Sequence, residues 1–181
     1  MRSDYLRGWV IDAQLGSSGH NIDVWLMATD GCVSRLSVPW CACIHVSAET
    51  RLLDNLSEWL QLPEISNKFS IGSTRIVKKR LSLDEFEMHN VLEIDVLDSR
   101  KIRKIAQHIE ARGDHHRFSL FSVDAHLAQR FFIDFGISPF QFVEWDGGSF
   151  SSFNENDKWP KMKVIELNFE YNSNNGFDTI K

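Results

Sequence analysis

The chain has 181 residues, of which 43% are hydrophobic and 25% charged, so it is long enough and apolar enough to bury a real core. Its formal net charge of −5 excludes a uniformly basic coat for nucleic acid, although it allows a local basic face. No stretch approaches the ~20 apolar residues of a membrane span, and charges interrupt the N-terminal segment where a signal peptide would be apolar. We expect a cytoplasmic protein, without membrane contact, of one domain or two small subdomains.

Residues 1–40 carry the signals of three consecutive strands. Two runs rich in Val, Ile and Trp flank a Gly-Ser turn at residues 16–19, and Asp30-Gly31 is typical of a tight hairpin. We predict a β-meander over residues 1–40.

Residues 41–124 alternate between strand and helix patterns. The expected elements are a strand at 41–47, a helix at 48–62 ended by Pro63, strands at 69–81 and 86–97, a helix at 98–113 and a strand at 116–124. Asp98 or Ser99 is the expected N-cap of the second helix, and Gly113 lies just past its end. This βαββαβ order predicts the split βαβ arrangement of a ferredoxin-like unit.

The C-terminal third begins with helical spacing at residues 125–136, followed by an aromatic strand at 140–145. We group both with the ferredoxin-like unit in a second domain, residues 41–145. Residues 146–160 are rich in Gly, Ser, Asn and Asp and predict a linker to a final strand at 162–171, within a third segment, 146–181. The predicted fold class is α+β.

Candidate chemistry is sparse. Cys41, Cys43 and His45 alternate, so a strand would place them on one face, where two thiolates and an imidazole would begin a zinc site. No fourth ligand is evident, and small cysteines are common on the inner face of a buried strand, so we predict neither metal nor cofactor nor disulfide. Gly-rich phosphate loops and a G-x-S-x-G elbow are also missing from the sequence.

Basic residues gather in two clusters that would suit nucleic acid. The strand cluster comprises Arg75, Lys78, Lys79 and Arg80, and the helix cluster comprises Arg100, Lys101, Arg103 and Lys104. Such clusters bind phosphates by releasing counterions, and nearby aromatic rings can stack on bases. A solvated face balanced by acidic residues is the alternative, and composition does not decide between the two.

The stretch "VDAHLAQRFFIDFGISP", residues 123–139, resembles the N-terminal domain of family B DNA polymerases, both archaeal replicative enzymes and bacterial DNA polymerase II. The shared pattern is a strand, an Asp, a short helix with Arg, aromatic and Asp, and then Ile-x-Pro. "GWVIDAQ", "VWLMATDG" and "LSVPW" follow the same order, so the resemblance covers nearly the whole chain. It implies a domain that forms a wall of the template channel and that, in archaeal members, captures template uracil in a pocket.

The resemblance implies functional positions in this chain. Arg130 matches the helix arginine near the pocket, where it would contact a phosphate or anchor neighbouring groups. Pro39 and Trp40 match a Pro-aromatic pair. From charge pairing alone, an arginine fixed by Asp124 or Asp134 is an equal alternative.

Several pocket positions depart from the family pattern. An expected aromatic is Leu15, an Ile-Pro-Phe sequence reads Ala125-His126-Leu127, and Ser99 occupies a small apolar position. We therefore predict a degenerate pocket that keeps generic contact with single-stranded DNA.

The final strand resembles the start of a 3′–5′ exonuclease domain, whose first motif is Asp-x-Glu. Here the pair is Asn168 and Glu170. Two metal ions need both carboxylates, and an amide supplies no negative charge, so we predict an inactive copy. Mg²⁺ is expected only for a full-length polymerase.

The sequence predicts a non-catalytic domain that binds single-stranded template or primer-template DNA in replication or repair. Its other partners would be the rest of a polymerase chain or replication subunits, and it would be either part of a longer polymerase or a stand-alone remnant. The alternative is a structural or protein-interaction module without DNA binding, which would dock a partner on the aromatic residues of 140–145.

Overall fold

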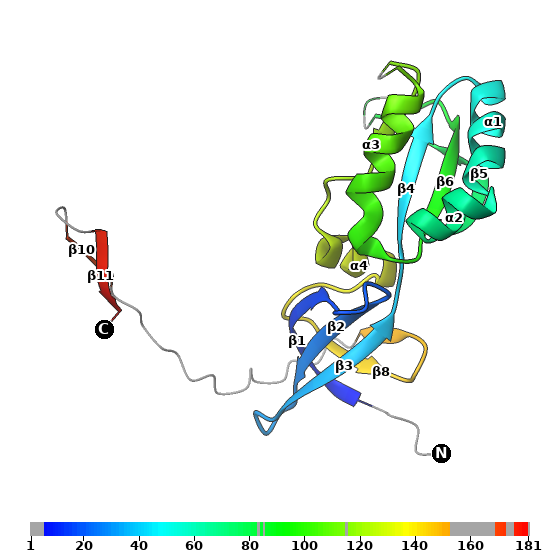
Figure 1. Ribbon diagram of the computed structural model, residues 1–181. Coiled ribbons are helices and arrows are strands. Elements are labelled where there is room, and N and C mark those ends of the chain that lie inside the picture. The colour runs from blue at the N-terminus through cyan, green and yellow to red at the C-terminus, as the bar shows by residue number, and fades with distance from the viewer. Residues whose placement is uncertain are drawn as a thin grey trace.

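Two antiparallel sheets follow one another along the long axis of the protein in the computed structural model (Figure 1). The structure describes residues 6–82, 84, 86–114 and 116–152, and the backbone of 169–172 and 176–180. Among the described residues, no helix is long and apolar enough to cross a membrane. The predicted α+β class is confirmed.

The first sheet has the strand order β3-β2-β1-β8-β9. Its strands are β1 (Leu6–Leu15), β2 (Asn21–Met27), β3 (Val33–Pro39), β8 (Phe142–Trp145) and β9 (Phe150–Ser152). The predicted meander is β1 to β3, paired in sequence order. The sequence predicted only a linker in the segment that contains β9. Asp146 and Gly147 form a turn there, which brings the chain back to pair with β8.

The strand β8 corrects one grouping made from the sequence. We had assigned residues 140–145 to the ferredoxin-like unit, whereas β8 pairs antiparallel with β1, with Trp9 opposite Phe142. Phe142 and Trp145 are only 6% and 5% exposed. Trp145 belongs to the buried cluster, and Phe142 packs edge to face against Trp9, with 4.6 Å between ring centroids. Local periodicity identified this strand but could not identify its partner.

The second sheet has the order β5-β6-β4-β7, and every neighbouring pair is antiparallel. Its elements are β4 (Ala42–Ser47), α1 (Thr50–Leu60), α2 (Pro63–Phe69), β5 (Ile71–Lys79), β6 (His89–Val96), η1 (Ser99–Lys101), α3 (Ile102–Arg112) and β7 (Ser119–Phe121). This is the predicted ferredoxin-like order with one extra helix. Pro63 separates α1 from α2 and occupies the first position of α2, where its missing N–H has no cost.

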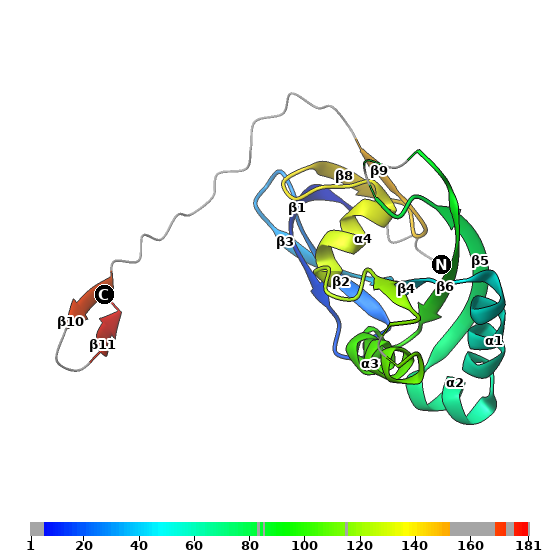
Figure 2. The same cartoon turned by 90° about the horizontal axis from the view of Figure 1, so that it is seen from above.

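The two faces of the second sheet differ in chemistry. Its apolar face, which includes Ile44, Leu92 and Ile94, packs under α1, α2 and α3, and Figure 2 shows these helices along one side of the sheet. The opposite face carries alternating polar side chains, among them His45 and Glu93. The helix α4 (Leu127–Phe135) lies beside β1 and β4 and so reaches both sheets.

A continuous buried cluster joins the two sheets. Trp40, in the link between β3 and β4, meets Phe131 of α4 edge to face, with 6.0 Å between ring centroids. At another contact, the turn after β1 touches the start of η1, where the Ser99 N–H donates to the carbonyl of Gly19 at 2.9 Å. Of the two expected N-caps, Asp98 and Ser99, Asp98 caps η1, where its side chain accepts from the Arg100 N–H.

The final part of the chain contains β10 (Phe169–Asn172) and β11 (Gly176–Ile180), which pair antiparallel. Most of the strand predicted at 162–171 lies outside the described residues. Asn168 and the side chain of Glu170 are also outside them, so the inactive exonuclease motif stays a prediction.

We expect Gly19→Ala to destabilise the fold more than Gly31→Ala. Both glycines have positive φ, 78° and 85°, but an added Cβ at Gly19 would collide with the Asp98 carboxylate, whereas Gly31 faces open space. The expected losses of unfolding free energy are about 1 kcal/mol at Gly31 and about 2–4 kcal/mol at Gly19. Urea unfolding measures both, and equal losses would contradict the close approach between the turn and η1.

Candidate functional site

Arg130 holds two backbone carbonyls on the second sheet. Its Nη1 donates to the Ser122 carbonyl at 2.9 Å, and its Nη2 donates to the Cys43 carbonyl at 2.5 Å. β7 leaves the edge of β4 at this point, since their pairing ends at Phe121 opposite His45. The guanidinium therefore fastens α4 to the sheet where the ladder of backbone hydrogen bonds stops.

Neither carboxylate suggested by the sequence bonds Arg130. Asp134 instead accepts from the Trp40 indole Nε1 at 2.9 Å, and Asp124 is exposed. Burial lowers the pKa of Arg130 from its ordinary value, which still leaves a guanidinium fully charged near neutrality. Its role as a phosphate contact stays a prediction.

The strand cluster divides between the two faces of β5. Arg75 bonds Glu93 and lies 3.4 Å from Asp95, and Lys79 lies 3.1 Å from Glu93. Lys78 points away from this network, toward a polar cavity beside the start of α1. Arg80 follows the strand, with its guanidinium 5.8 Å from the ring of Phe86.

Glu93 is the centre of the charged network on the polar face and is only 8% exposed. Burial alone would raise its pKa, but hydrogen bonds from His45 and Lys79 and the charges of Lys79 and Arg75 outweigh burial and lower the pKa to about 2. Glu93 therefore stays ionised and fully paired near neutral pH.

A group of side chains on the polar face of the second sheet has the atom types that bind metal ions. Cys43, Glu93 and Asp95 place ligand-type atoms within 4.8 Å of one another. Arg75 bonds both carboxylates, however, and burial raises the pKa of the Cys43 thiol to about 11. The cluster already has its positive charge, so its chemistry is that of an ion-pair network.

The helix cluster also divides into structural and free cations. Arg100 bonds Asp98 and donates to the carbonyls of Ser17 and Ser18 at 2.7 and 3.0 Å. Lys101 donates to the Lys68 carbonyl at 3.0 Å and to Ser70 Oγ at 2.8 Å. In the described part of the chain, Arg103 and Lys104 have neither a hydrogen-bonding nor an ion-pair partner, and both are exposed.

A cavity of about 410 Å³ lies between the end of β1, the start of α3 and the segment before α4. It gathers positions that the resemblance placed in the template pocket and adds the exposed cation Arg103. Its wall includes Leu15, Ser99, Arg103, Ala125, His126 and Leu127. The cavity wall does not include Pro39, Trp40 or Arg130. Pro39 is exposed at the end of β3, Trp40 is buried, and Arg130 bonds the carbonyls of Cys43 and Ser122.

The fold is similar to part of a family B DNA polymerase. The solved polymerase of the hyperthermophilic archaeon Pyrobaculum calidifontis matches with a TM-score of 0.56 and 12% sequence identity. The match covers 91% of this chain and 18% of the polymerase chain, so this chain spans less than a fifth of that enzyme. At this identity the likeness concerns the fold alone. No protein-family model matches the chain, and no curated protein does.

Sequence reasoning missed two features of the candidate surfaces. Gln14 and Val123 also line the cavity, and neither had a local signal because they meet only after folding. The aromatic docking surface predicted at 140–145 is wrong for two of its three aromatic side chains, Phe142 and Trp145, which are buried. Phe140 is 53% exposed.

Removing the Arg130 side chain is expected to lower the unfolding free energy by about 2–3 kcal/mol, because two carbonyls lose a charged donor. Gln129→Ala, at an exposed neighbouring position of α4, is the matched control and should change stability by less than about 0.5 kcal/mol. Urea unfolding of both variants tests this. Equal, small losses would mean that water replaces the guanidinium at both carbonyls.

The pH dependence of stability is expected to depend on Glu93. Its folded pKa of about 2 lies below the ordinary 4.5, so its ionised pairing stabilises the fold above pH 4.5 and is lost as the pH falls toward 2. Glu93→Gln should be less stable at neutral pH and lose less stability across that interval. Urea midpoints measured against pH check this, with Glu58→Gln, an exposed position of α1, retaining the native profile.

Proposed function

We propose that this chain is a non-catalytic domain of the family B DNA polymerase type that binds single-stranded DNA during replication or repair. The observation that carries the proposal is the cavity between β1, α3 and the segment before α4, which gathers Leu15, Ser99 and residues 125–127 beside exposed Arg103. The similarity of fold to a family B polymerase supports it.

The cavity wall combines apolar side chains with the charges of Arg100, Arg103 and Asp124. Arg103 lies at its wall, and exposed Lys104, the next residue of α3, provides a second free cation outside the wall for a neighbouring phosphate of the strand. Binding of this kind releases counterions and depends strongly on salt. Leu15 and Leu127 give a base an apolar surface, which favours sequence-independent contact over reading of base edges.

A longer polymerase would provide the catalytic parts and their Mg²⁺. The chain matches 18% of the archaeal polymerase, so we propose the remaining domains of such an enzyme, or replication subunits, as its partners. In this arrangement the domain positions the template, and catalysis takes place elsewhere in the assembly.

Single-stranded DNA labelled with a fluorophore should bind the domain in anisotropy titrations, more tightly at low than at moderate salt. Arg103→Ala with Lys104→Ala should weaken binding about tenfold or more and reduce the salt dependence by about two charges. Arg112→Ala, at the far end of α3, removes one positive charge from a residue outside the cavity wall and is the control for Arg103→Ala alone. No binding at either salt concentration would refute the proposal.

A scaffold without DNA binding is the second candidate, and the apolar side of α4 favours it. Ile133 is 72% exposed at the edge of a cavity of about 470 Å³ whose wall includes Phe132, Ile137 and Pro139. Ile133→Ser should then abolish retention of polymerase subunits, whereas the double variant of Arg103 and Lys104 should retain them.

A further inference from the structure

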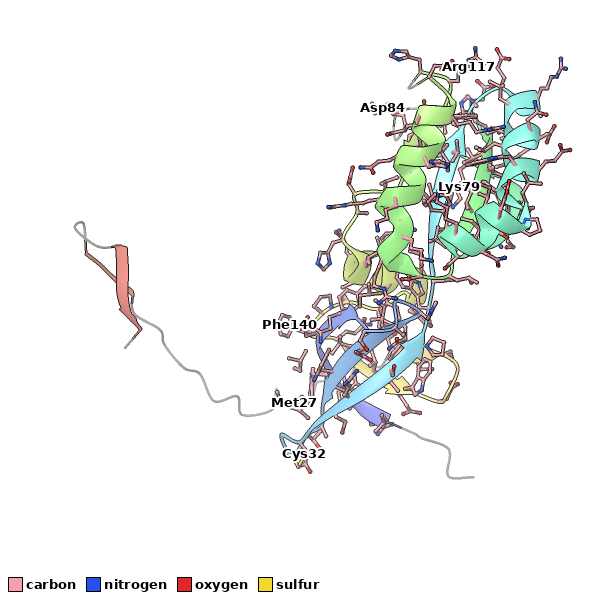
Figure 3. All side chains as sticks on the ribbon, in the orientation of Figure 1. Met27, Cys32, Lys79, Asp84, Arg117 and Phe140 are labelled. Atoms are coloured by element: carbon pink, nitrogen blue, oxygen red, sulfur yellow. The ribbon has the colours of Figure 1, made fainter. Side chains whose placement is uncertain are left out.

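A second cavity, of about 190 Å³, opens on the polar face of the second sheet where β5 and β7 end. Its wall combines basic, hydroxyl and apolar side chains, and it shares no residue with the cavity beside α3. The lining residues are His45, Lys79, Arg80, Leu81, Val91, Phe121 and Ser122. Figure 3 shows Lys79 in the part of the molecule that contains the second sheet, far from Cys32 at the tip of the β2–β3 hairpin.

Positive charge exceeds negative charge around this cavity. Lys79 and Arg80 line it, and among the residues that the structure describes no Asp or Glu does. Glu93 lies behind Lys79 and His45, where its bonds to them and to Arg75 already use both of its oxygens. The cavity is therefore a site for an anion rather than for a cation.

His45 has one ring nitrogen placed between a donor and an acceptor. Its Nε2 lies 2.9 Å from Glu93 Oε2 and 2.6 Å from Lys79 Nζ. A single ring nitrogen cannot donate a proton to the carboxylate and accept one from the ammonium at the same time. An anion that drew the ammonium toward the cavity would remove this conflict, because a proton on Nε2 would then bond Glu93.

Burial and the neighbouring charges both change the pKa of His45. Burial lowers its pKa, the charges of Lys79 and Arg130 lower it further, and the bond to Glu93 opposes them. The other charged groups on this face are Arg75 and Asp95, which pair with each other. A bound anion adds negative charge beside the ring and favours the imidazolium.

We infer that this cavity binds a phosphate group. Lys79 and Arg80 supply charged donors, and the Ser122 hydroxyl, 3.4 Å from His45 Nδ1, supplies a neutral one. Protonated His45, whose Nε2 bonds Glu93, adds positive charge at the wall. Such a set of donors suits the several oxygens of a tetrahedral oxyanion better than the two of a carboxylate. Apolar walls from Leu81, Val91 and Phe121 shield these hydrogen bonds from water and strengthen them. The inference goes beyond the proposed function because it involves neither the first cavity nor Arg103.

Sulfate is the test ligand, since it remains a dianion where phosphate itself titrates. The thermal midpoint and the His45 ring resonances are followed in sulfate titrations against chloride at equal ionic strength. Sulfate should raise the midpoint and shift the resonances, and its affinity should increase as the pH falls from about 8 to about 6. Replacing the imidazole in His45→Gln should remove that pH dependence.

Arg80→Ala should weaken sulfate binding about tenfold, because the cavity loses a charged donor. Lys78→Ala removes the same charge from a neighbouring residue that lines a different cavity, and it should stay within about twofold of the native affinity. Equal weakening by both variants, or no effect of sulfate beyond that of chloride, would overturn the inference.

Competition identifies the source of the phosphate. If single-stranded DNA displaces sulfate, and Arg80→Ala abolishes this displacement, the site belongs to a phosphate of a DNA strand. If sulfate binds and DNA does not compete with it, the site belongs to a small phosphate compound. Arg103→Ala should leave sulfate affinity unchanged in both cases, so failure of the proposed DNA binding is separable from failure of this site.

Discussion

The bond between Arg130 and two backbone carbonyls is the constraint on which the arrangement of the two sheets depends. The carbonyls belong to Cys43 on β4 and to Ser122 just past β7, so one side chain fixes α4 against both strands. The same helix presents Phe131 to Trp40 and accepts the Trp40 indole N–H at Asp134. The helix therefore joins the ferredoxin-like sheet to the link that leads from the meander.

Internal pairing uses half of the eight clustered cations. Arg100 closes the turn after β1 by binding two carbonyls there, and Lys101 ties the start of α3 to the end of α2. Arg75 and Lys79 neutralise a nearly buried carboxylate. These cations are held by partners that nucleic acid would have to displace, so a count of basic residues overstates the surface available to phosphates.

The sequence was sufficient where the signal is local. Helical spacing at Leu53, Leu56 and Leu60 identified α1. The cysteines of 41–43 were expected on the inner face of their strand, whereas Cys43 lies on the polar face of β4, and the buried face carries Ala42, Ile44 and Val46. The sequence was insufficient where two contacting residues are far apart along the chain. The pairing of β8 with β1 and the carbonyl partners of Arg130 depend on contacts that exist only after the chain has folded, and no periodicity encodes them.

The short segment between β7 and α4 connects the two proposed binding cavities. Phe121 and Ser122 line the cavity at the end of β5, whereas Val123 to Ala128 line the one beside α3. Ser122 has a φ of 64°, a left-handed conformation that costs a non-glycine residue about 1–2 kcal/mol. Its carbonyl is one of the two that Arg130 binds, so this charge–carbonyl bond compensates the strain and fixes the segment whose successive residues line the two cavities. The permanent charge in α4 is thus explained by the backbone that it holds, and any ligand at either cavity must be accommodated within that restraint.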